Sequence, residues 1–213
     1  QELLPSKEAK KLTLTCDLET TGLNPYCDRI VLVSYRFGGE GPVKLVPISD
    51  AQDDPEFVYA LSDRKTTLRG HNIKFDALFL RASGLTLNCQ LEDTRVLAYL
   101  NWPDVPHDLK SLVERKLMRK VTRIEDILVQ PKKKHLEAFK NSSAYVYVGG
   151  GYATSTKLKK YAESDVVNCD DLKRSMSISP WWRDVEMPLT KCLFDMESRG
   201  ITLDTKQLSL LEA

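Results

Sequence analysis

Lys11–Glu19 reads KLTLTCDLE, and from Leu12 onward its side chains alternate between apolar and polar. Successive side chains of a β-strand point to opposite faces, so this alternation predicts a strand with one face packed on a core. Asp17 and Glu19 lie two residues apart and therefore project from the same face, about 7 Å apart along the backbone. The stretch thus predicts a strand that presents a pair of acids on one side.

The segments that follow predict an α/β domain. Two further β-rich runs, Ile30–Phe37 and Val43–Ile48, are set off by the turn-forming pairs Asn24-Pro25 and Gly38-Gly39, which favours an antiparallel meander. Helices and one short strand then alternate, with a strand predicted over 67–70 and helices over 53–61, 72–82, 93–100, 108–118 and 155–176. We expect a mixed sheet that opens with an antiparallel meander and is flanked by helices.

Three other stretches carry weaker patterns. Residues 129–134 and 141–154 are predicted to be loops or edge segments. A helix with apolar spacing is predicted from Pro180, with a break at Gly200 and a second helical pattern over Gln207–Ala213. Because the chain starts at Gln1 and stops inside that second pattern, we expect it to be a fragment of a longer protein.

Composition limits the classes of protein to which the chain can belong. Its 213 residues, 42% of them hydrophobic, suffice for one globular domain and a short appendage. The net charge of +1 creates no overall field, so a nucleic-acid partner would have to bind local patches. The five cysteines lack CxxC spacing and are expected to be reduced and mostly buried. No long apolar window and no secretory signal occur, so we expect a soluble, intracellular protein without a membrane partner.

Three acidic segments could carry chemistry. Asp17 and Glu19 could share a divalent ion, although an exposed strand end with two acids has the same pattern. Asp76 lies in a strongly apolar helix, so its charge requires either a Lys or Arg partner or a metal ion. Tyr161 and Asp165 lie one helical turn apart on an apolar stripe. There the carboxylate can reach a metal and the phenol a water, or the two groups can bond each other.

Taken in this order, the three segments resemble the motifs of the DEDD superfamily of 3′–5′ exonucleases. The resemblance is to the tyrosine subclass, because the position five residues before Asp165, where the other subclass carries histidine, is Lys160. Residues 91–100 and 107–112 look like connecting helices of the proofreading domain in family A DNA polymerases. Residues 186–204 look like the segment that joins that domain to the polymerase thumb. The resemblance therefore implies an exonuclease domain over 1–178 and the helical start of a thumb-like segment over 179–213.

The resemblance also implies an RNase H-like fold and two divalent ions, Mg²⁺ or Mn²⁺. Asp17, Glu19 and Asp165 would hold one ion, and Asp17 and Asp76 the other, while Tyr161 would orient the attacking water. Residues implied to bind the substrate are Thr20, Leu23, Asn72 and Phe75. Leu23 would pack against the terminal base and Asn72 would lie beside the nucleotide, although a turn position and a helix cap, respectively, explain these two residues equally well.

A basic run could bind the phosphate backbone. Residues 110–134 hold nine Lys or Arg and three acids, a balance of +6, and include the consecutive Lys132, Lys133 and Lys134. Such a run suits nucleic acid, and it equally suits a solvated helix face. Three tyrosines near Gly149–Gly151, namely Tyr145, Tyr147 and Tyr152, could stack on bases, but an edge strand is the favoured interpretation.

Together these features predict a proofreading exonuclease that acts on the 3′ end of single-stranded DNA. Its expected partner is a polymerase domain C-terminal to this chain, and its expected source is a phage, a bacterium or an organelle. Two alternatives compete with this prediction. One is a free-standing exonuclease that trims RNA, and the other is an inactive module that only binds nucleic acid.

Overall fold

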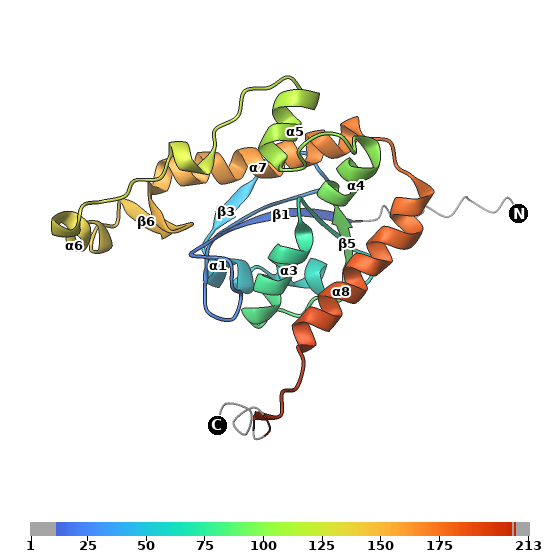
Figure 1. Ribbon diagram of the computed structural model, residues 1–213, viewed down its shortest axis with the longest axis horizontal. Coiled ribbons are helices and arrows are strands. Elements are labelled where there is room, and N and C mark those ends of the chain that lie inside the picture. Colours follow the sequence, from blue (N-terminus) through green and yellow to red (C-terminus); the bar gives the residue numbers. More distant parts are fainter. Residues whose placement is uncertain (1–11, 206, 208–213) are drawn as a thin grey trace, which may run out of the picture.

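The sheet of the protein has five strands in the order β3-β2-β1-β4-β5. The computed structural model describes residues 12–205 and 207. The strands are β1 (Thr13–Thr20), β2 (Ile30–Phe37), β3 (Lys44–Val46), β4 (Thr67–Gly70) and β5 (Gln90–Asp93). β1 pairs antiparallel with β2, and β2 pairs antiparallel with β3, whereas β4 and β5 extend the sheet in parallel. The predicted opening meander is confirmed, and β1 lies at the centre of the sheet (Figure 1).

Helices cover both faces of this sheet (Figure 1). The longer elements are α1 (Ile48–Asp53), α2 (Pro55–Ser62), α3 (Ile73–Ala82), α4 (Thr94–Asn101), α5 (Leu109–Lys116), α7 (Ser155–Ser175) and α8 (Met187–Arg199). Leu14, Cys16 and Leu18, on the apolar face of β1, join a buried cluster with side chains of α1, α2 and α3. Phe194 of α8 is fully buried in the same cluster. α7 and α5 lie over the other face, which carries the acids.

A hairpin arm projects beside this core, toward the left of Figure 1. It contains η2 (Lys133–His135), α6 (Leu136–Lys140), β6 (Tyr145–Val148) and β7 (Gly151–Thr154). The Gly149 N–H donates a hydrogen bond of 2.9 Å to the Thr20 carbonyl, which ties the hairpin turn to the end of β1. The predicted edge character of this region is confirmed, because β6 and β7 form a separate two-stranded sheet.

A fully buried carboxylate, Asp170, joins α7 to the sheet. It accepts hydrogen bonds from the Thr15 hydroxyl at 2.7 Å, from Arg36 Nε at 2.7 Å and from Arg69 Nη1 at 2.9 Å. Arg69 also pairs with Glu92, so the ionic network continues across β4 and β5. Buried charges require such partners, because their loss of hydration is otherwise uncompensated.

The bond between Thr15 and Asp170 sets the register of α7 on β1. From Thr15, the next side chain on the same face is Asp17, about 7 Å along the strand. From Asp170, five residues back along the helix lead to Asp165, about 7.5 Å away at 1.5 Å per residue. α7 therefore runs antiparallel to β1, and one buried contact brings Asp17 and Asp165 opposite each other.

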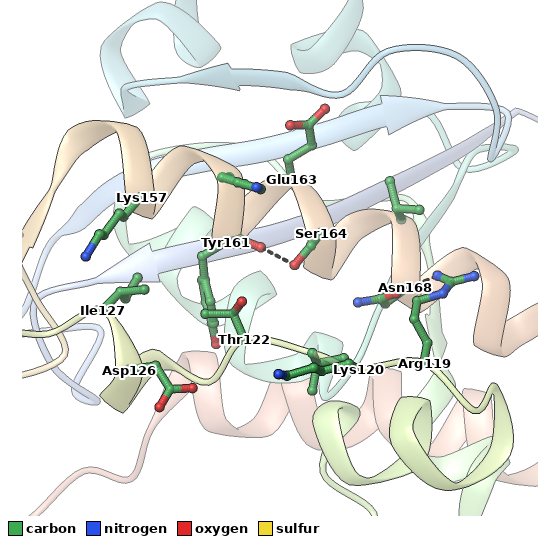
Figure 2. A pocket seen from close by; sticks show the side chains of 13 residues that line it. Arg119, Lys120, Thr122, Asp126, Ile127, Lys157, Tyr161, Glu163, Ser164 and Asn168 are labelled. Carbon is green, nitrogen blue, oxygen red and sulfur yellow. Dashed lines mark hydrogen bonds between the residues drawn. The ribbon is translucent and has the colours of Figure 1, made fainter.

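A groove of about 690 Å³ lies between α7 and the segment 119–127. Tyr161 lines its wall, and Lys120 and Lys157 lie on either side of this tyrosine (Figure 2). The segment includes the short turn η1 (Ile124–Asp126). The groove therefore opens next to one of the residues that the sequence singled out.

Several predicted boundaries were wrong for identifiable physical reasons. The helix predicted over 93–100 begins one residue later, because Asp93 is its N-cap and accepts hydrogen bonds from the Arg95 and Val96 N–H groups. The resemblance implied a helix that already begins at Leu91, but residues Gln90–Asp93 form strand β5. The helix predicted over 53–61 begins two residues later, at Pro55, because Asp54 is its N-cap, and a separate short helix that was not predicted, α1, precedes it.

At the C-terminal side, the predicted helix and its break are confirmed over the described residues. A π-helical turn, η3 (Trp182–Glu186), leads into α8, which ends at Gly200 with a φ of 68°. The pattern predicted over Gln207–Ala213 lies outside the described residues apart from Gln207 itself. All five cysteines are free, with Cys27 and Cys192 exposed and the others buried. No helix in the described ranges is long and apolar enough to cross a membrane.

The first testable prediction concerns Asp170. Asp170→Ala removes the shared partner of the buried Arg36 and the partly buried Arg69, and breaking a buried ion pair destabilises a protein by about 3–5 kcal/mol. Its neighbour Asp171 pairs near the surface with Arg119 and Arg174, so the control Asp171→Ala is expected to change stability by about 1 kcal/mol or less. Urea unfolding of both variants measures the difference. Equal losses of stability in the two would refute the role given to Asp170.

Candidate active site

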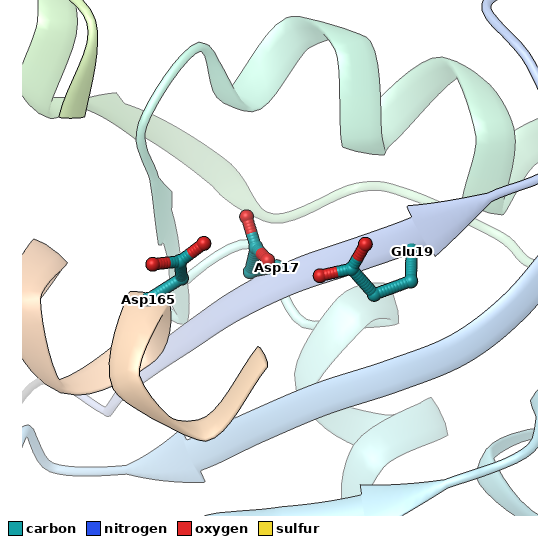
Figure 3. A group of neighbouring side chains, drawn as sticks. All are labelled: Asp17, Glu19 and Asp165. Atoms are coloured by element: carbon teal, nitrogen blue, oxygen red, sulfur yellow. The ribbon is translucent and has the colours of Figure 1, made fainter. Parts of the chain in front are cut away.

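Three carboxylates from two elements meet over β1. Each of Asp17, Glu19 and Asp165 offers one oxygen, and these oxygens all lie within 4.8 Å of one another. Asp17 and Glu19 come from β1 and Asp165 comes from α7, and the three carboxylates face a common space (Figure 3). Glu19 and Asp165 are buried, with 7% and 5% of their surface exposed, and Asp17 is partly buried. The structure thus brings together three of the four acids that the sequence suggested as ligands.

The fourth acid, Asp76, lies next to this group on α3. It is 4% exposed, and its carboxylate accepts a hydrogen bond of 3.0 Å from the Leu18 N–H, between the two acids of β1. Among the described residues no Lys or Arg forms an ion pair with it. Of the two partners expected for Asp76, a basic side chain or a metal ion, the basic side chain therefore has no support in its surroundings. Asp76 lies outside the three-carboxylate group defined by the 4.8 Å limit.

The clustered acids disfavour one another's charge. Burial, together with the nearby Asp165 charge, raises the pKa of Asp17 from 3.8 to about 8, while the Lys110 charge opposes both. Burial also raises the pKa values of Glu19 and Asp76, each with a contribution from the Asp17 charge. Repelling carboxylates in a shared, partly dry space are stabilised by a cation. Hard oxygen ligands of this kind suit a divalent metal such as Mg²⁺.

Tyr161 lies beside Asp165 at the edge of the cluster. The tyrosine is partly buried, and burial raises the pKa of its phenol, with further contributions from the charges of Asp165, Glu19 and Asp17. The hydroxyl therefore stays protonated across the physiological pH range and can donate a hydrogen bond. It is available to a water molecule or to a carboxylate in the cluster.

Lys110 is a site residue that the sequence analysis did not identify. Its ammonium pairs with the Asp165 carboxylate and lies 4.0 Å from the centroid of the Tyr161 ring. It was assigned to the surface basic run, but only 8% of its surface is exposed. The available signal was its place beside the apolar residues Leu109 and Val113 on α5, where a lysine needs a buried acid.

The residues expected to bind substrate have different surroundings. The Thr20 hydroxyl donates to the Gly22 carbonyl at 2.7 Å, so it already stabilises the turn after β1. Leu23 is 83% exposed on that turn. Asn72 adopts the left-handed conformation, with φ of 71°, and makes no capping bond through its side chain. Phe75 is half-buried against Phe79, with ring centroids 4.9 Å apart.

Much of the basic run faces solvent or forms local ion pairs. Lys132, Lys133 and Lys134 are all exposed at the start of the hairpin arm. Arg119 pairs with Asp171, and Arg123 pairs with Glu114. The three tyrosines of the arm pack on one another or on Phe139: Tyr145, Tyr147 and Tyr152. These contacts agree with the favoured interpretation of the tyrosines as parts of edge strands.

Similarity to known proteins extends over most of the chain. A family described as 3′-5′ exonuclease, from DNA polymerases of type A, matches residues 2–176. DNA polymerase I of Synechocystis sp. is 25% identical over 208 residues, which cover 92% of this chain and 20% of the polymerase. DNA polymerase I of Borreliella burgdorferi is 26% identical over 214 residues, covering 95% and 22%, respectively. The chain thus spans about a fifth of the length of these relatives.

Solved structures share the fold. NrnC of Brucella melitensis superimposes with a TM-score of 0.60 at 22% identity, covering 88% of this chain and 82% of NrnC. The polymerase domain of Pol1 from M. smegmatis gives a TM-score of 0.60 at 16% identity over 95% of this chain and 31% of that protein. Escherichia coli RNase D gives 0.53 at 18% identity over 89% and 46%. The predicted RNase H-like fold is therefore confirmed.

The family match and the geometry agree on the same part of the molecule. Residues 2–176 include both segments of the three-carboxylate group, the neighbouring Asp76 and the whole of α7. This chain therefore belongs to the family of 3′-5′ exonuclease domains of DNA polymerases of type A.

Proposed function

We propose that this exonuclease domain removes nucleotides from the 3′ end of single-stranded DNA and serves as the proofreading part of a DNA polymerase. The observation that carries the proposal is the group of three carboxylate oxygens within 4.8 Å of one another. The polymerase relatives favour DNA as the substrate. They also favour a polymerase domain as the partner, with residues 179–213 as the start of a thumb-like segment.

The acids hold two divalent ions, Mg²⁺ or Mn²⁺, in this proposal. Asp17, Glu19 and Asp165 hold one ion, and Asp17 and Asp76 hold the second. Brucella melitensis NrnC, which shares the fold, has been solved with bound Mg²⁺, and this supports the choice of metal class. Such ions, when bound, supply Lewis acidity for the attacking water and for the oxygen that leaves the phosphate.

The remaining groups of the site position the reactants. Tyr161 orients the attacking water by donating a hydrogen bond, for which its raised pKa keeps it protonated. Lys110 holds the Asp165 carboxylate and the Tyr161 ring in place, because its ammonium contacts both. Orientation of this kind depends on distances that are fixed before the substrate binds.

Further residues contact the strand in this proposal. Leu23 packs against the terminal base, and its large exposed surface leaves it free to do so. Thr20, Asn72 and Phe75 lie along the terminal nucleotide. Lys132, Lys133 and Lys134 bind more distant phosphates through their charge, so their contribution weakens as salt rises.

The competing function is the trimming of RNA. NrnC and RNase D share the fold, and RNase D is an exoribonuclease involved in structured RNA processing. The experiment that separates the two functions uses 5′-labelled single strands of DNA and RNA with the same sequence, each with and without Mg²⁺. A ladder that shortens from the 3′ end only with Mg²⁺, and faster on DNA, supports the proposal. Faster cleavage of RNA favours the alternative, and binding without cleavage indicates an inactive module.

The second testable prediction concerns the acids. Asp17→Ala and Asp165→Ala are each expected to abolish the ladder on DNA, because each removes a carboxylate from the metal-binding group. Both variants are expected to remain folded. Without metal, Asp17→Ala gains stability because repulsion among the acids is relieved, whereas Asp165→Ala also removes the ion-pair partner of the buried Lys110, which opposes that gain. The control is Asp50→Ala, which changes an exposed acid on α1. Near-normal cleavage by Asp17→Ala refutes the assignment.

The third testable prediction concerns Tyr161→Phe, which removes a hydroxyl and leaves the carboxylates intact. Positioned proton-transfer groups contribute about 10²- to 10⁴-fold to rate, so an orienting hydroxyl is expected to lower kcat by about 10²-fold or less. Metal affinity, measured by Mn²⁺ titration, is expected to stay unchanged. Tyr59→Phe is the control, since Tyr59 is 63% exposed. A Tyr161→Phe variant as inactive as Asp165→Ala contradicts this role.

The fourth testable prediction concerns pH. The folded protein without metal binds a proton at Asp17 more tightly than the unfolded chain, because the pKa is raised from 3.8 to about 8. Stability without metal therefore falls as pH rises through this window, and added Mg²⁺ restores it most at the alkaline end. Thermal unfolding in EDTA between pH 5 and pH 9 measures the effect. Asp17→Asn is expected to flatten the dependence, and a stability that rises with pH excludes the explanation.

A further inference from the structure

The groove beside Tyr161 has two basic walls. On α7, Lys157, Lys160 and Tyr161 lie at helical spacings of three and four residues and so share one side of the helix. The opposite wall is the segment 119–127, which contributes Arg119 and Lys120. Figure 2 shows Lys157 on one side of Tyr161, and Lys120 and Arg119 on the other.

The charges of the groove favour an anionic ligand. Its lining includes four basic residues, Arg119, Lys120, Lys157 and Lys160, against two acids, Asp126 and Glu163. Lys120, Lys157 and Lys160 are exposed, and within residues 12–205 and 207 none of them has an ion-pair partner. Arg119 is held by Asn168 and Asp171, each at 2.8 Å, so one basic group has a fixed position. Three lysines therefore remain available to phosphates.

Tyr161 joins the groove to the catalytic centre. It lines the groove, and it also lies beside Asp165 and under the Lys110 ammonium. A strand with one phosphate at the carboxylates can therefore continue into the groove without a gap. The volume of about 690 Å³ lies within the range of sites for small molecules, so it accommodates a short length of single strand.

The direction of the strand follows from the chemistry of a 3′ exonuclease. At most one nucleotide lies on the 3′ side of the bond that is cut, and every other nucleotide lies on the 5′ side. An extended basic surface next to the centre is consequently of use only to the 5′ part of the strand. Contacts to phosphates hold a strand without regard to its base sequence, as an exonuclease requires.

We propose that the groove between α7 and residues 119–127 binds the phosphate backbone of the substrate strand on the 5′ side of the bond that is cut, through Lys120, Lys157 and Lys160. The inference rests on the proposed exonuclease function and adds the route by which the strand leaves the site. It also gives a role to Arg119 and Lys120, the members of the basic run 110–134 that line the groove beside Tyr161. Lys110, the first residue of that run, is instead buried and pairs with Asp165.

The fifth testable prediction compares two double variants that each remove two positive charges. Lys157→Gln/Lys160→Gln changes the groove, and Arg64→Gln/Lys65→Gln changes the turn before β4. That turn adjoins Thr13 at the start of β1, away from the acids. Glutamine has nearly the same helix propensity as lysine, so α7 is expected to stay folded, as circular dichroism can check.

Binding is measured in EDTA, where no cleavage occurs, by the anisotropy of a fluorescein-labelled thymidine dodecamer at several salt concentrations. The groove variant is expected to lower the slope of log affinity against log salt by up to about 0.7 for each phosphate that its lysines no longer bind. The control variant is expected to keep the slope of the unmodified protein. An unchanged slope in the groove variant overturns the inference.

Turnover with Mg²⁺ separates the groove from the catalytic centre. The preference for the dodecamer over a thymidine dinucleotide, measured as the ratio of kcat/KM values, is expected to fall in the groove variant but not in the control. An equal decrease on both substrates means that these lysines act at the scissile phosphate and refutes a role along the strand. If the unmodified protein binds the dodecamer through the groove yet cuts neither substrate, the proposed function fails while the binding surface stands.

Discussion

The Asp170 carboxylate, buried between α7 and the sheet, is the contact on which the site depends. It receives hydrogen bonds from β1, β2 and β4 through Thr15, Arg36 and Arg69. No rotation or sliding of α7 preserves all three bonds, so the helix is confined to one register. The acids of the candidate site then require no fine adjustment of their own, because Asp17 and Asp165 lie at similar distances from that contact along their elements. A buried network that stabilises the fold thus also aligns the chemistry.

The same arrangement concentrates negative charge. Four acids, Asp17, Glu19, Asp76 and Asp165, gather near one end of β1. Burial raises the pKa of each, and repulsion from neighbouring acids adds to the rise for Asp17, Glu19 and Asp76. One ammonium, that of Lys110, lies inside this group and offsets part of the repulsion. A centre of this kind is poised to take up divalent cations, since the uptake relieves an unfavourable state that folding has already created.

The parts of the structure that sequence reasoning predicted well are those with a local geometric signature. Alternation of apolar and polar residues predicted β1. A spacing of two residues on a strand predicted that Asp17 and Glu19 share one face, and a spacing of four on a helix predicted the same for Tyr161 and Asp165. Contacts between distant segments leave no such signature. The partners of Asp170 and the pairing of Lys110 with Asp165 depend on how α5 and α7 dock. β5 was missed because its residues, Gln90–Asp93, include two acids, which are uncommon in strands, and it becomes a strand by pairing with β4.

The separations along the chain between these contacts have a consequence for the order of folding. The bond from Thr15 to Asp170 joins residues 155 positions apart, and the bond from Leu18 to Asp76 joins residues 58 positions apart. Contacts between distant residues form late, because closing long loops is entropically unfavourable. On a ribosome, β1 and α3 therefore emerge well before α7, and the sheet has to wait for the helix that supplies Asp165. The acidic centre is complete only when the far end of the domain has been synthesised, so a growing chain lacks the full set of acids.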